Sequence, residues 1–178
     1  VVITNGSFEA YSGSLSGGYY QHIPNGTPAS PLLTGWGVGY AGLASSNTGT
    51  GVDLVRTTSG QLTPAAQGIQ FVDLNGTAGP GNIYQTLSGT VTGQTYLVTF
   101  QYASTTPAKG SATAYNGTSL VSLASTLIPV AGLSTPSPGS ALVWSAGSLW
   151  FTATSSTTTL VFDQLVPPGG NTGLYLDN

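Results

Sequence analysis

The chain has 178 residues, and only 4% of them are Asp, Glu, Lys or Arg, against about 25% in an ordinary soluble domain. Its two cations, Arg56 and Lys109, cannot neutralise a nucleic-acid backbone, and a net charge of −3 gives no attraction to anionic lipid. No apolar run approaches the roughly 18 residues of a membrane-spanning helix. We therefore expect neither nucleic-acid binding nor membrane insertion.

The composition predicts one folded domain that works outside the cell. Hydrophobic residues make up 39% of the chain, which is enough for a core. The length suits one domain over residues 1–178 better than two. Cys and Met are both absent, as fits an exposed and oxidising setting. Because no basic and apolar leader opens the sequence, we interpret it as a mature or trimmed extracellular product.

The predicted elements are short β-strands, because 26 Gly and 11 Pro interrupt every potential helical stripe. In chain order, we predict strands at Val52–Arg56, Ile69–Leu74, Asn82–Leu87, Gln94–Ser104, Ser111–Tyr115, Leu142–Trp144, Ser148–Thr154 and Thr158–Asp163. The loops fall at Ser12–Gly18, Ala41–Gly51, Leu133–Gly139 and Val166–Gly173. Many short strands separated by turns predict an all-β fold, an antiparallel β-sandwich or jelly roll.

Alternation assigns the faces of the longer strands. In Gln94–Ser104, one face carries Tyr96, Val98, Phe100 and Tyr102. In Ser148–Thr154, Trp150 points away from Leu149 and Phe151, toward the outside of its sheet. Other strands are apolar on both faces, with Ile69 and Phe71 opposed to Val72 and Leu74, and Val161 opposed to Leu160 and Phe162. We expect such strands to be covered on both sides.

Several short segments follow one another along the chain in an order that is typical of a known family. They are Asn5-Gly6-Ser7-Phe8-Glu9, Gly35-Trp36, Val52-Asp53-Leu54-Val55, Gln67 to Gly76, Ile83 to Leu87, Gly93 to Phe100, Phe151-Thr152-Ala153, Thr159 to Phe162 and Leu176-Asp177-Asn178. This order resembles the galactose-binding-like jelly-roll domains of plant cell-wall proteins and of bacterial surface proteins with sorting tails. It is more distantly similar to xylan- and glucan-binding carbohydrate modules. The chain departs from the family in lacking Cys and in carrying an insertion around residues 120–147.

The resemblance implies a structural calcium site. In the similar domains, the early Glu and the Asp of the closing strand lie side by side and hold Ca²⁺. Carried over, the ligands are the side chains of Glu9 and Asp177 with backbone carbonyls around Asn5 and Ser7. The alternative is that both acids accept hydrogen bonds from backbone amides and so tie the two chain ends together.

Catalysis finds little support in the sequence. His22 is the only histidine, and we expect it to lie in a surface loop. Without Cys no Cys–His pair is possible. The remaining acids stand at or near strand ends, where carboxylates commonly cap loop amides. We expect a protein that is not an enzyme.

Aromatic residues outside the predicted core are the candidates for ligand contact, because sugar rings stack on Trp and Tyr. They are Tyr19, Tyr20, Tyr40, Tyr115, Trp144 and Trp150. For each of them the alternative is partial burial under a loop.

Two functions remain, and the sequence favours the first. The first is a self-assembling subunit of a cell-surface fibre or matrix, in which Val1, Val2, Ile3 and Thr4 add as a strand to the open edge of a neighbour. A surface with so few charges lacks the repulsion that keeps β-proteins apart. The alternative is a carbohydrate-binding module that recognises a wall or matrix polysaccharide.

Overall fold

The computed structural model describes residues 1–11, 20–40, 51–57, 62–77, 79–104, 108–122, 125–127, 140–166 and 173–178. Its regular elements are β-strands. They are β1 (Tyr20–Pro24), β2 (Gly37–Val38), β3 (Gly51–Arg56), β4 (Leu62–Thr63), β5 (Gln70–Asp73), β6 (Asn82–Ser88), β7 (Thr95–Ser104), β8 (Lys109–Asn116), β9 (Ser119–Leu120), β10 (Ser125–Leu127), β11 (Ser140–Ala141), β12 (Ser145–Thr152), β13 (Thr157–Val166) and β14 (Leu174–Asp177). The predicted strands are confirmed within a few residues, except Leu142–Trp144, which precedes β12.

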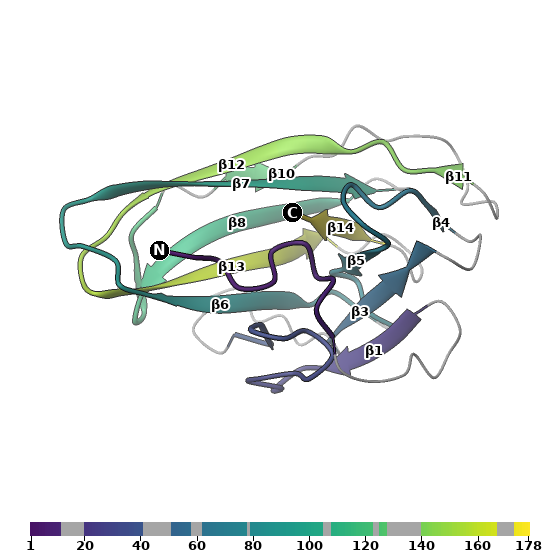
Figure 1. Ribbon diagram of the computed structural model, residues 1–178, viewed down its shortest axis with the longest axis horizontal. Helices are drawn as coiled ribbons and strands as arrows, with labels where there is room; N and C mark the ends of the chain where they lie inside the picture. The colour runs from purple at the N-terminus through teal and green to yellow at the C-terminus, as the bar shows by residue number, and fades with distance from the viewer. Residues whose placement is uncertain are drawn as a thin grey trace.

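Two antiparallel sheets face each other, so the predicted β-sandwich is confirmed. Sheet A has the order β1-β3-β5-β14-β7-β12, and sheet B has the order β10-β8-β13-β6-β2. Figure 1 shows the two layers, with β7 and β12 above β8, β13 and β6. A short parallel pair, β4 with β11, stands apart from both sheets.

The core lies between the sheets and is built around aromatic rings. The Trp36 ring lies 5.5 Å from the Phe8 ring and 6.0 Å from the Phe162 ring, and Phe162 meets Phe100 edge-on at 5.0 Å. The alternation predicted for β7 is confirmed, since Val98 and Phe100 are buried while Leu97 and Thr99 are exposed. β12 follows the same rule, with Leu149 and Phe151 buried.

A second apolar cluster covers part of the outer face of sheet A. It contains Val55, Ala65, Phe71, Ala103, Leu142 and Tyr175, with Tyr20 and Trp144 packed against it. The Phe71 ring contacts the Tyr175 ring at 5.2 Å and the Trp144 ring at 5.7 Å. The two-sided burial of β5 is therefore produced by this chain itself. Ile69 is an exception to the predicted burial, because it precedes β5 and is 42% exposed.

The strands of both halves of the chain share one sandwich, as the predicted single domain requires. Sheet A combines β1, β3 and β5 with β7, β12 and β14. Half of the predicted insertion around 120–147 lies outside the described residues, which include 120–122, 125–127 and 140–147 of it. Within the described part of the chain, no helix is long and apolar enough to cross a membrane.

A glycine at the start of β3 allows β1 to pair closely with it. Gly51 has a φ of 143°, and a Cβ atom added there would collide with the backbone carbonyl of Ile23 in β1. Gly93 also has a positive φ, 84°, but an added Cβ atom there would meet nothing within 4 Å. A substitution at Gly93 therefore tests backbone strain alone, whereas one at Gly51 tests backbone strain together with the close approach of β1.

We predict that Gly51→Ala lowers the free energy of unfolding by about 3 kcal/mol or more, because strain and collision combine. Gly93→Ala serves as the matched control and is expected to cost about 1 kcal/mol from backbone strain alone. Urea unfolding of both variants measures the difference. Equal losses would show that β1 and β3 are not packed as closely as described.

Candidate functional site

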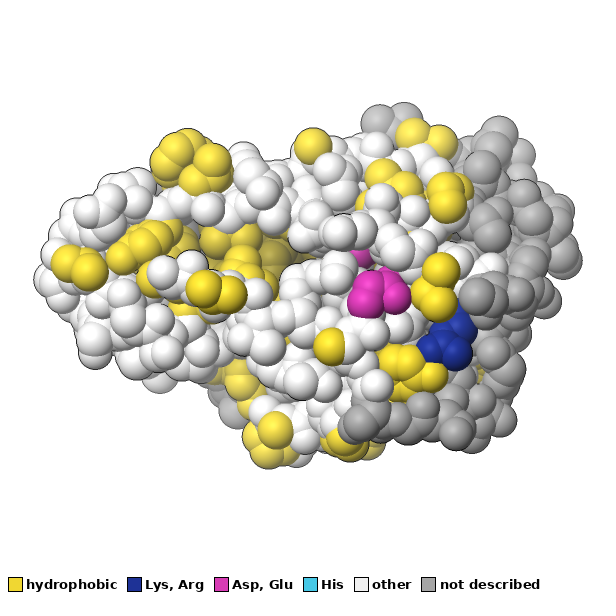
Figure 2. Space-filling model, viewed as in Figure 1, with side chains coloured by type: hydrophobic (Ala, Val, Ile, Leu, Met, Phe, Trp, Pro, Cys, Tyr) yellow, Lys and Arg dark blue, Asp and Glu magenta, His cyan; other side chains and the backbone are white. Residues whose placement is uncertain are grey.

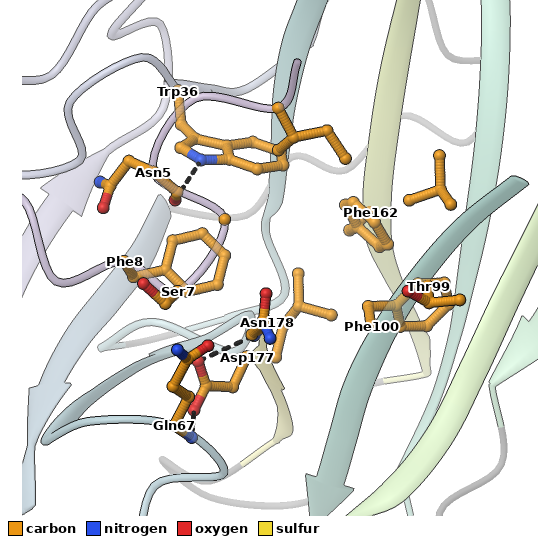
Figure 3. Close-up of a pocket in the computed structure, with 14 residues that line it drawn as sticks. Asn5, Ser7, Phe8, Trp36, Gln67, Thr99, Phe100, Phe162, Asp177 and Asn178 are labelled. Atoms are coloured by element: carbon orange, nitrogen blue, oxygen red, sulfur yellow. Dashed lines mark hydrogen bonds between the residues drawn. The ribbon is translucent and has the colours of Figure 1, made fainter. Parts of the chain in front are cut away.

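The two ends of the chain meet beside a groove between the sheets. β14 pairs with only four residues of β7, Gln101 to Ser104, so the stretch from Thr95 to Phe100 has no strand partner on that side among the described residues. The groove next to it has a volume of about 380 Å³. Its lining consists of Ile3, Asn5, Gly6, Ser7, Phe8, Trp36, Gln67, Val98, Thr99, Phe100, Phe162, Leu176, Asp177 and Asn178. Figure 2 shows it as a hollow floored by hydrophobic side chains, and Figure 3 shows the residues around it.

A tight N-terminal turn forms one wall of this groove. Asn5 and Phe8 have positive φ values of 52° and 57°. The Asn5 side chain holds the turn, because its amide donates to the carbonyls of Ala10 and Thr34 and its oxygen accepts from the Ala10 amide. The Asn5 carbonyl accepts hydrogen bonds from the Trp36 indole at 3.0 Å and from the Phe8 amide at 3.2 Å.

The two predicted calcium ligands with side chains, Glu9 and Asp177, both bind one short backbone segment. Glu9 Oε1 accepts hydrogen bonds from the amides of Ile69 and Gln70, each at 2.8 Å. Asp177 Oδ2 accepts from the Gln67 amide at 2.8 Å. An added Cβ atom at Gly68, whose φ is 67°, would collide with the Glu9 carboxylate. The alternative predicted from the sequence, acids that bind backbone amides, is thus observed.

Some of the predicted ligands fit calcium and one does not. Carboxylates that each accept amide hydrogen bonds keep further lone pairs for a hard cation. The Asn5 carbonyl is already used by two donors, so this predicted ligand does not fit. Among the described residues, no group of three or more His, Cys, Asp or Glu side chains is arranged to hold a metal ion. Calcium held by Glu9, Asp177 and the Ser7 carbonyl therefore stays a proposal, and its role there is to stabilise the fold.

Burial raises the pKa of Asp177 to about 6, although backbone amides such as that of Gln67 act in the opposite direction. The nearby Glu9 carboxylate adds to the rise. The ionised form of Asp177 is therefore disfavoured in the folded chain compared with the unfolded chain, where the ordinary value of 3.8 applies.

Three tyrosines lie together on the outer face of sheet B. The Tyr40 ring lies 5.2 Å from the Tyr84 ring and 5.8 Å from the Tyr115 ring. Tyr84 pairs across the sheet with Val161, which is fully buried. The Tyr40 hydroxyl donates to the Gly117 carbonyl at 2.8 Å. This contact holds Tyr40 in the fold, and we interpret the trio mainly as cover for Val161. Tyr84 was not among the predicted candidates, although its alternation with buried Ile83 in β6 marks it as outward-facing.

Trp144 lies at a shallow pocket on the outer face of sheet A. The pocket has a volume of about 500 Å³ and is lined by Pro64, Ala65, Ala66, Gln67, Gln101, Trp144 and Asn178. The Trp144 indole donates to the Pro64 carbonyl at 2.9 Å. An aromatic ring is thus fixed in a pocket whose lining includes two glutamines and Asn178. Neither Gln67 nor Gln101 was predicted as a site residue, because isolated glutamines give no signal in a chain this polar.

The remaining aromatic candidates are separate from this pocket. Tyr20 packs against the second apolar cluster, and Tyr19 lies outside the described residues. Trp150 is 59% exposed on β12 and pairs across the sheet with Leu97, which is 47% exposed. The predicted outward direction of Trp150 is confirmed.

The predicted strand-adding segment, Val1 to Thr4, is not part of any strand. Val1 and Val2 are 53% and 81% exposed, and Ile3 packs on the core. Thr4 is held by Gln85, whose side chain bonds both its amide and its carbonyl at 2.8 Å. The segment does not pair as a strand within its own domain either.

His22 lies in β1, where the sequence had predicted a surface loop. Its Nδ1 atom lies 2.8 Å from Asp53 Oδ1, and Asp53 Oδ2 accepts hydrogen bonds from Thr77. The pair therefore fastens β1 to β3 and to the loop after β5.

We predict that Asp177 makes stability depend on pH. Because its folded pKa lies above its unfolded value, the folded chain gains stability from the bound proton at low pH. In a chelator, the free energy of unfolding should fall by about 2 kcal/mol between pH 4 and pH 7. Asp177→Asn, which keeps the shape and one of the two accepting oxygens, should remove this part of the fall, as urea unfolding across that range measures.

The same unfolding measurements, repeated with added Ca²⁺, test the calcium proposal. A cation bound by Glu9 and Asp177 favours the ionised carboxylates, so the stabilisation by added Ca²⁺ should grow as the pH rises. Thermal unfolding at pH 7.5 that is identical in chelator and in Ca²⁺ would refute the calcium proposal. It would leave the pH dependence of the chelated protein unaffected.

Comparison with known proteins supports the fold and assigns the family. Among solved structures, one described as "CBM4 structure and function" matches with 14% identity and a TM-score of 0.51, over 99% of this chain and 96% of that one. A CBM61 domain in complex with β-1,4-galactotriose matches with 14% identity and a TM-score of 0.50, over 80% and 83%. A putative sugar binding protein from Bacteroides thetaiotaomicron matches with 11% identity and a TM-score of 0.50, over 98% and 95%.

At these identities the likeness shows the fold alone, and it agrees with the predicted galactose-binding-like jelly roll. A search of curated proteins found no match. The model of the family described as "Protein of unknown function (DUF642)" matches residues 2–169. Since this match spans nearly the whole chain, the chain belongs to that family.

Proposed function

We propose that this chain is a non-catalytic carbohydrate-binding module of the cell exterior. The observation that carries the proposal is the pocket that Trp144 lines together with Gln67, Gln101 and Asn178. This proposal adopts the alternative function predicted from the sequence in place of the favoured one.

The chemistry of the pocket suits a neutral sugar. An aromatic ring offers a flat apolar surface to the C–H face of a pyranose, and carboxamides both donate and accept hydrogen bonds with its hydroxyls. The side chains of the lining residues carry no charge, so an anionic ligand would find no cation among them. Packing on Phe71 and the bond to Pro64 fix the Trp144 ring before any ligand arrives, which lowers the entropic cost of binding.

The comparisons and the composition add indirect support. The similar structures include a domain with a bound galactotriose and a putative sugar binding protein, although their low identity carries no ligand over to this chain. An extracellular location fits the absence of Cys and Met from the sequence. Among the described residues, the lining of the Trp144 pocket includes no acidic, histidine or hydroxyl side chain, so a binding role suits this pocket better than catalysis.

We predict that Gln101→Ala weakens binding to polysaccharide about tenfold or more, because it removes a donor and an acceptor from the pocket. Gln94→Ala, an exposed glutamine in the turn before β7, is the matched control and should bind like the natural protein. Affinity electrophoresis against a panel of neutral and acidic wall polysaccharides measures both. If the natural protein is retarded by none of them, the proposed function is wrong.

A second function, self-assembly by strand addition, is favoured by the open edge of β7. The stretch from Thr95 to Phe100 has an unpaired side beside an apolar groove, and an extended segment from a second copy would complete the ladder. The exposed β-branched residues Val1 and Val2 are the candidate donor.

We predict that Val2→Lys reduces any self-association of the protein, because a charge would have to enter or border the apolar groove. Val91→Lys places the same charge on a valine that is 62% exposed in the turn before β7, and it controls for net charge. Sedimentation velocity across a range of protein concentrations compares the two. A natural protein that stays monomeric at every concentration would rule out the second function.

A further inference from the structure

The outer face of β7 and β12 forms a continuous strip that begins at the Trp144 pocket. Residues 144, 146, 148 and 150 alternate onto this outer face, since Leu149 and Phe151 point into the core. Across the sheet, Ala146 pairs with Gln101, Ser148 with Thr99, and Trp150 with Leu97. Gln101 belongs both to the pocket and to the strip, which joins them.

The side chains along this strip are accessible and carry no ionisable group. Ala146, Ser148 and Thr99 are exposed, Gln101 is half-buried, and Trp150 keeps 59% of its surface exposed at the far end. Hydroxyl and carboxamide groups therefore occupy the space between two tryptophans. Only Leu97 and Trp150 are large exposed apolar residues here, too few for the apolar centre of a typical protein interface.

The distance between the tryptophans sets the size of the ligand. Six residues of an extended strand span about 20 Å, at roughly 3.3 Å per residue. A single terminal sugar cannot contact both rings, whereas an extended chain of several sugars can. The narrow strip of small residues between the rings also leaves room for a flat ribbon to lie along the strands.

We infer that the strip from Trp144 to Trp150 binds the interior of a linear, neutral polysaccharide, with one tryptophan stacked on a sugar at each end. This inference rests on the proposed function and extends it from a pocket to a ligand class. Trp150 is the residue that distinguishes an extended chain from a short sugar, because it lies outside the pocket. Trp144 and Gln101 would contact a short sugar and an extended chain alike.

The test is a series of linear neutral oligosaccharides from disaccharide to octasaccharide, chosen from the polysaccharides that retard the natural protein and titrated by calorimetry. For the natural protein, affinity should rise with length until the ligand reaches both tryptophans and then stay constant. Trp150→Ala should lose about tenfold in affinity for the long oligosaccharides and leave the short ones unchanged. Its melting temperature should match that of the natural protein, because the side chain is exposed.

Leu120→Ala, at a residue that is 51% exposed in β9, is the matched control and should change neither length dependence nor affinity. If Trp150→Ala binds every length as the natural protein does while Gln101→Ala weakens binding, the strip is wrong and the proposed function stands. If the natural protein binds no polysaccharide, the proposed function is wrong, and the inference that rests on it is wrong as well. If Trp150→Ala instead dissociates a dimer, the strip is a contact between copies and the inference is overturned.

Discussion

Four residues of β14 hold the two parts of sheet A together. Its Tyr175 and Leu176 pair with β5 on one side, and Leu174 to Asp177 pair with β7 on the other. Without them, β1, β3 and β5 would have no ladder to β7 and β12. Leu174 and Leu176 also enter the main core, while Tyr175 joins the second cluster on the outer face. One short strand thus contributes to the ladder and to both apolar clusters, and the site is built around its end.

The strands with two apolar faces are covered by other parts of the same chain. The sequence predicted cover on both sides, and it favoured assembly with neighbouring copies. In the structure, Phe71 is covered by Trp144 and Tyr175, and Val161 is buried beside Tyr84. The chain therefore provides its own second layer on part of sheet A and on sheet B. Among the described residues in the strands of sheet A, the large apolar side chains that stay exposed, Leu97 and Trp150, lie on the strip along β7 and β12.

The sequence predicted what depends on local alternation and not what depends on tertiary contact. β7 and β12 were identified with the correct inward faces, because ten and eight residues give the period of two enough repeats. β1 was mistaken for a loop, since His22 and Gln21 mask its pattern and its pairing with β3 decides its form. Trp144 was a predicted candidate, but its partners Gln67 and Gln101 come from distant segments. Their proximity follows from the register of β14 between β5 and β7, which no local pattern encodes.

The calcium proposal and the carbohydrate proposal concern one backbone segment. Glu9 and Asp177 bind the amides of Gln67, Ile69 and Gln70, and the Gln67 side chain lines the Trp144 pocket together with Asn178. Whatever fixes the two carboxylates therefore also fixes one side of that pocket. Burial of Asp177 in its ionised form lowers the stability of the fold, as its raised pKa indicates. The hydrogen bond from the Gln67 amide to this carboxylate holds Gln67 in place for the proposed ligand, which is a physical reason to retain the acid. β14 therefore joins the two parts of sheet A and also supports the proposed ligand surface, because its last residue, Asp177, binds the Gln67 amide.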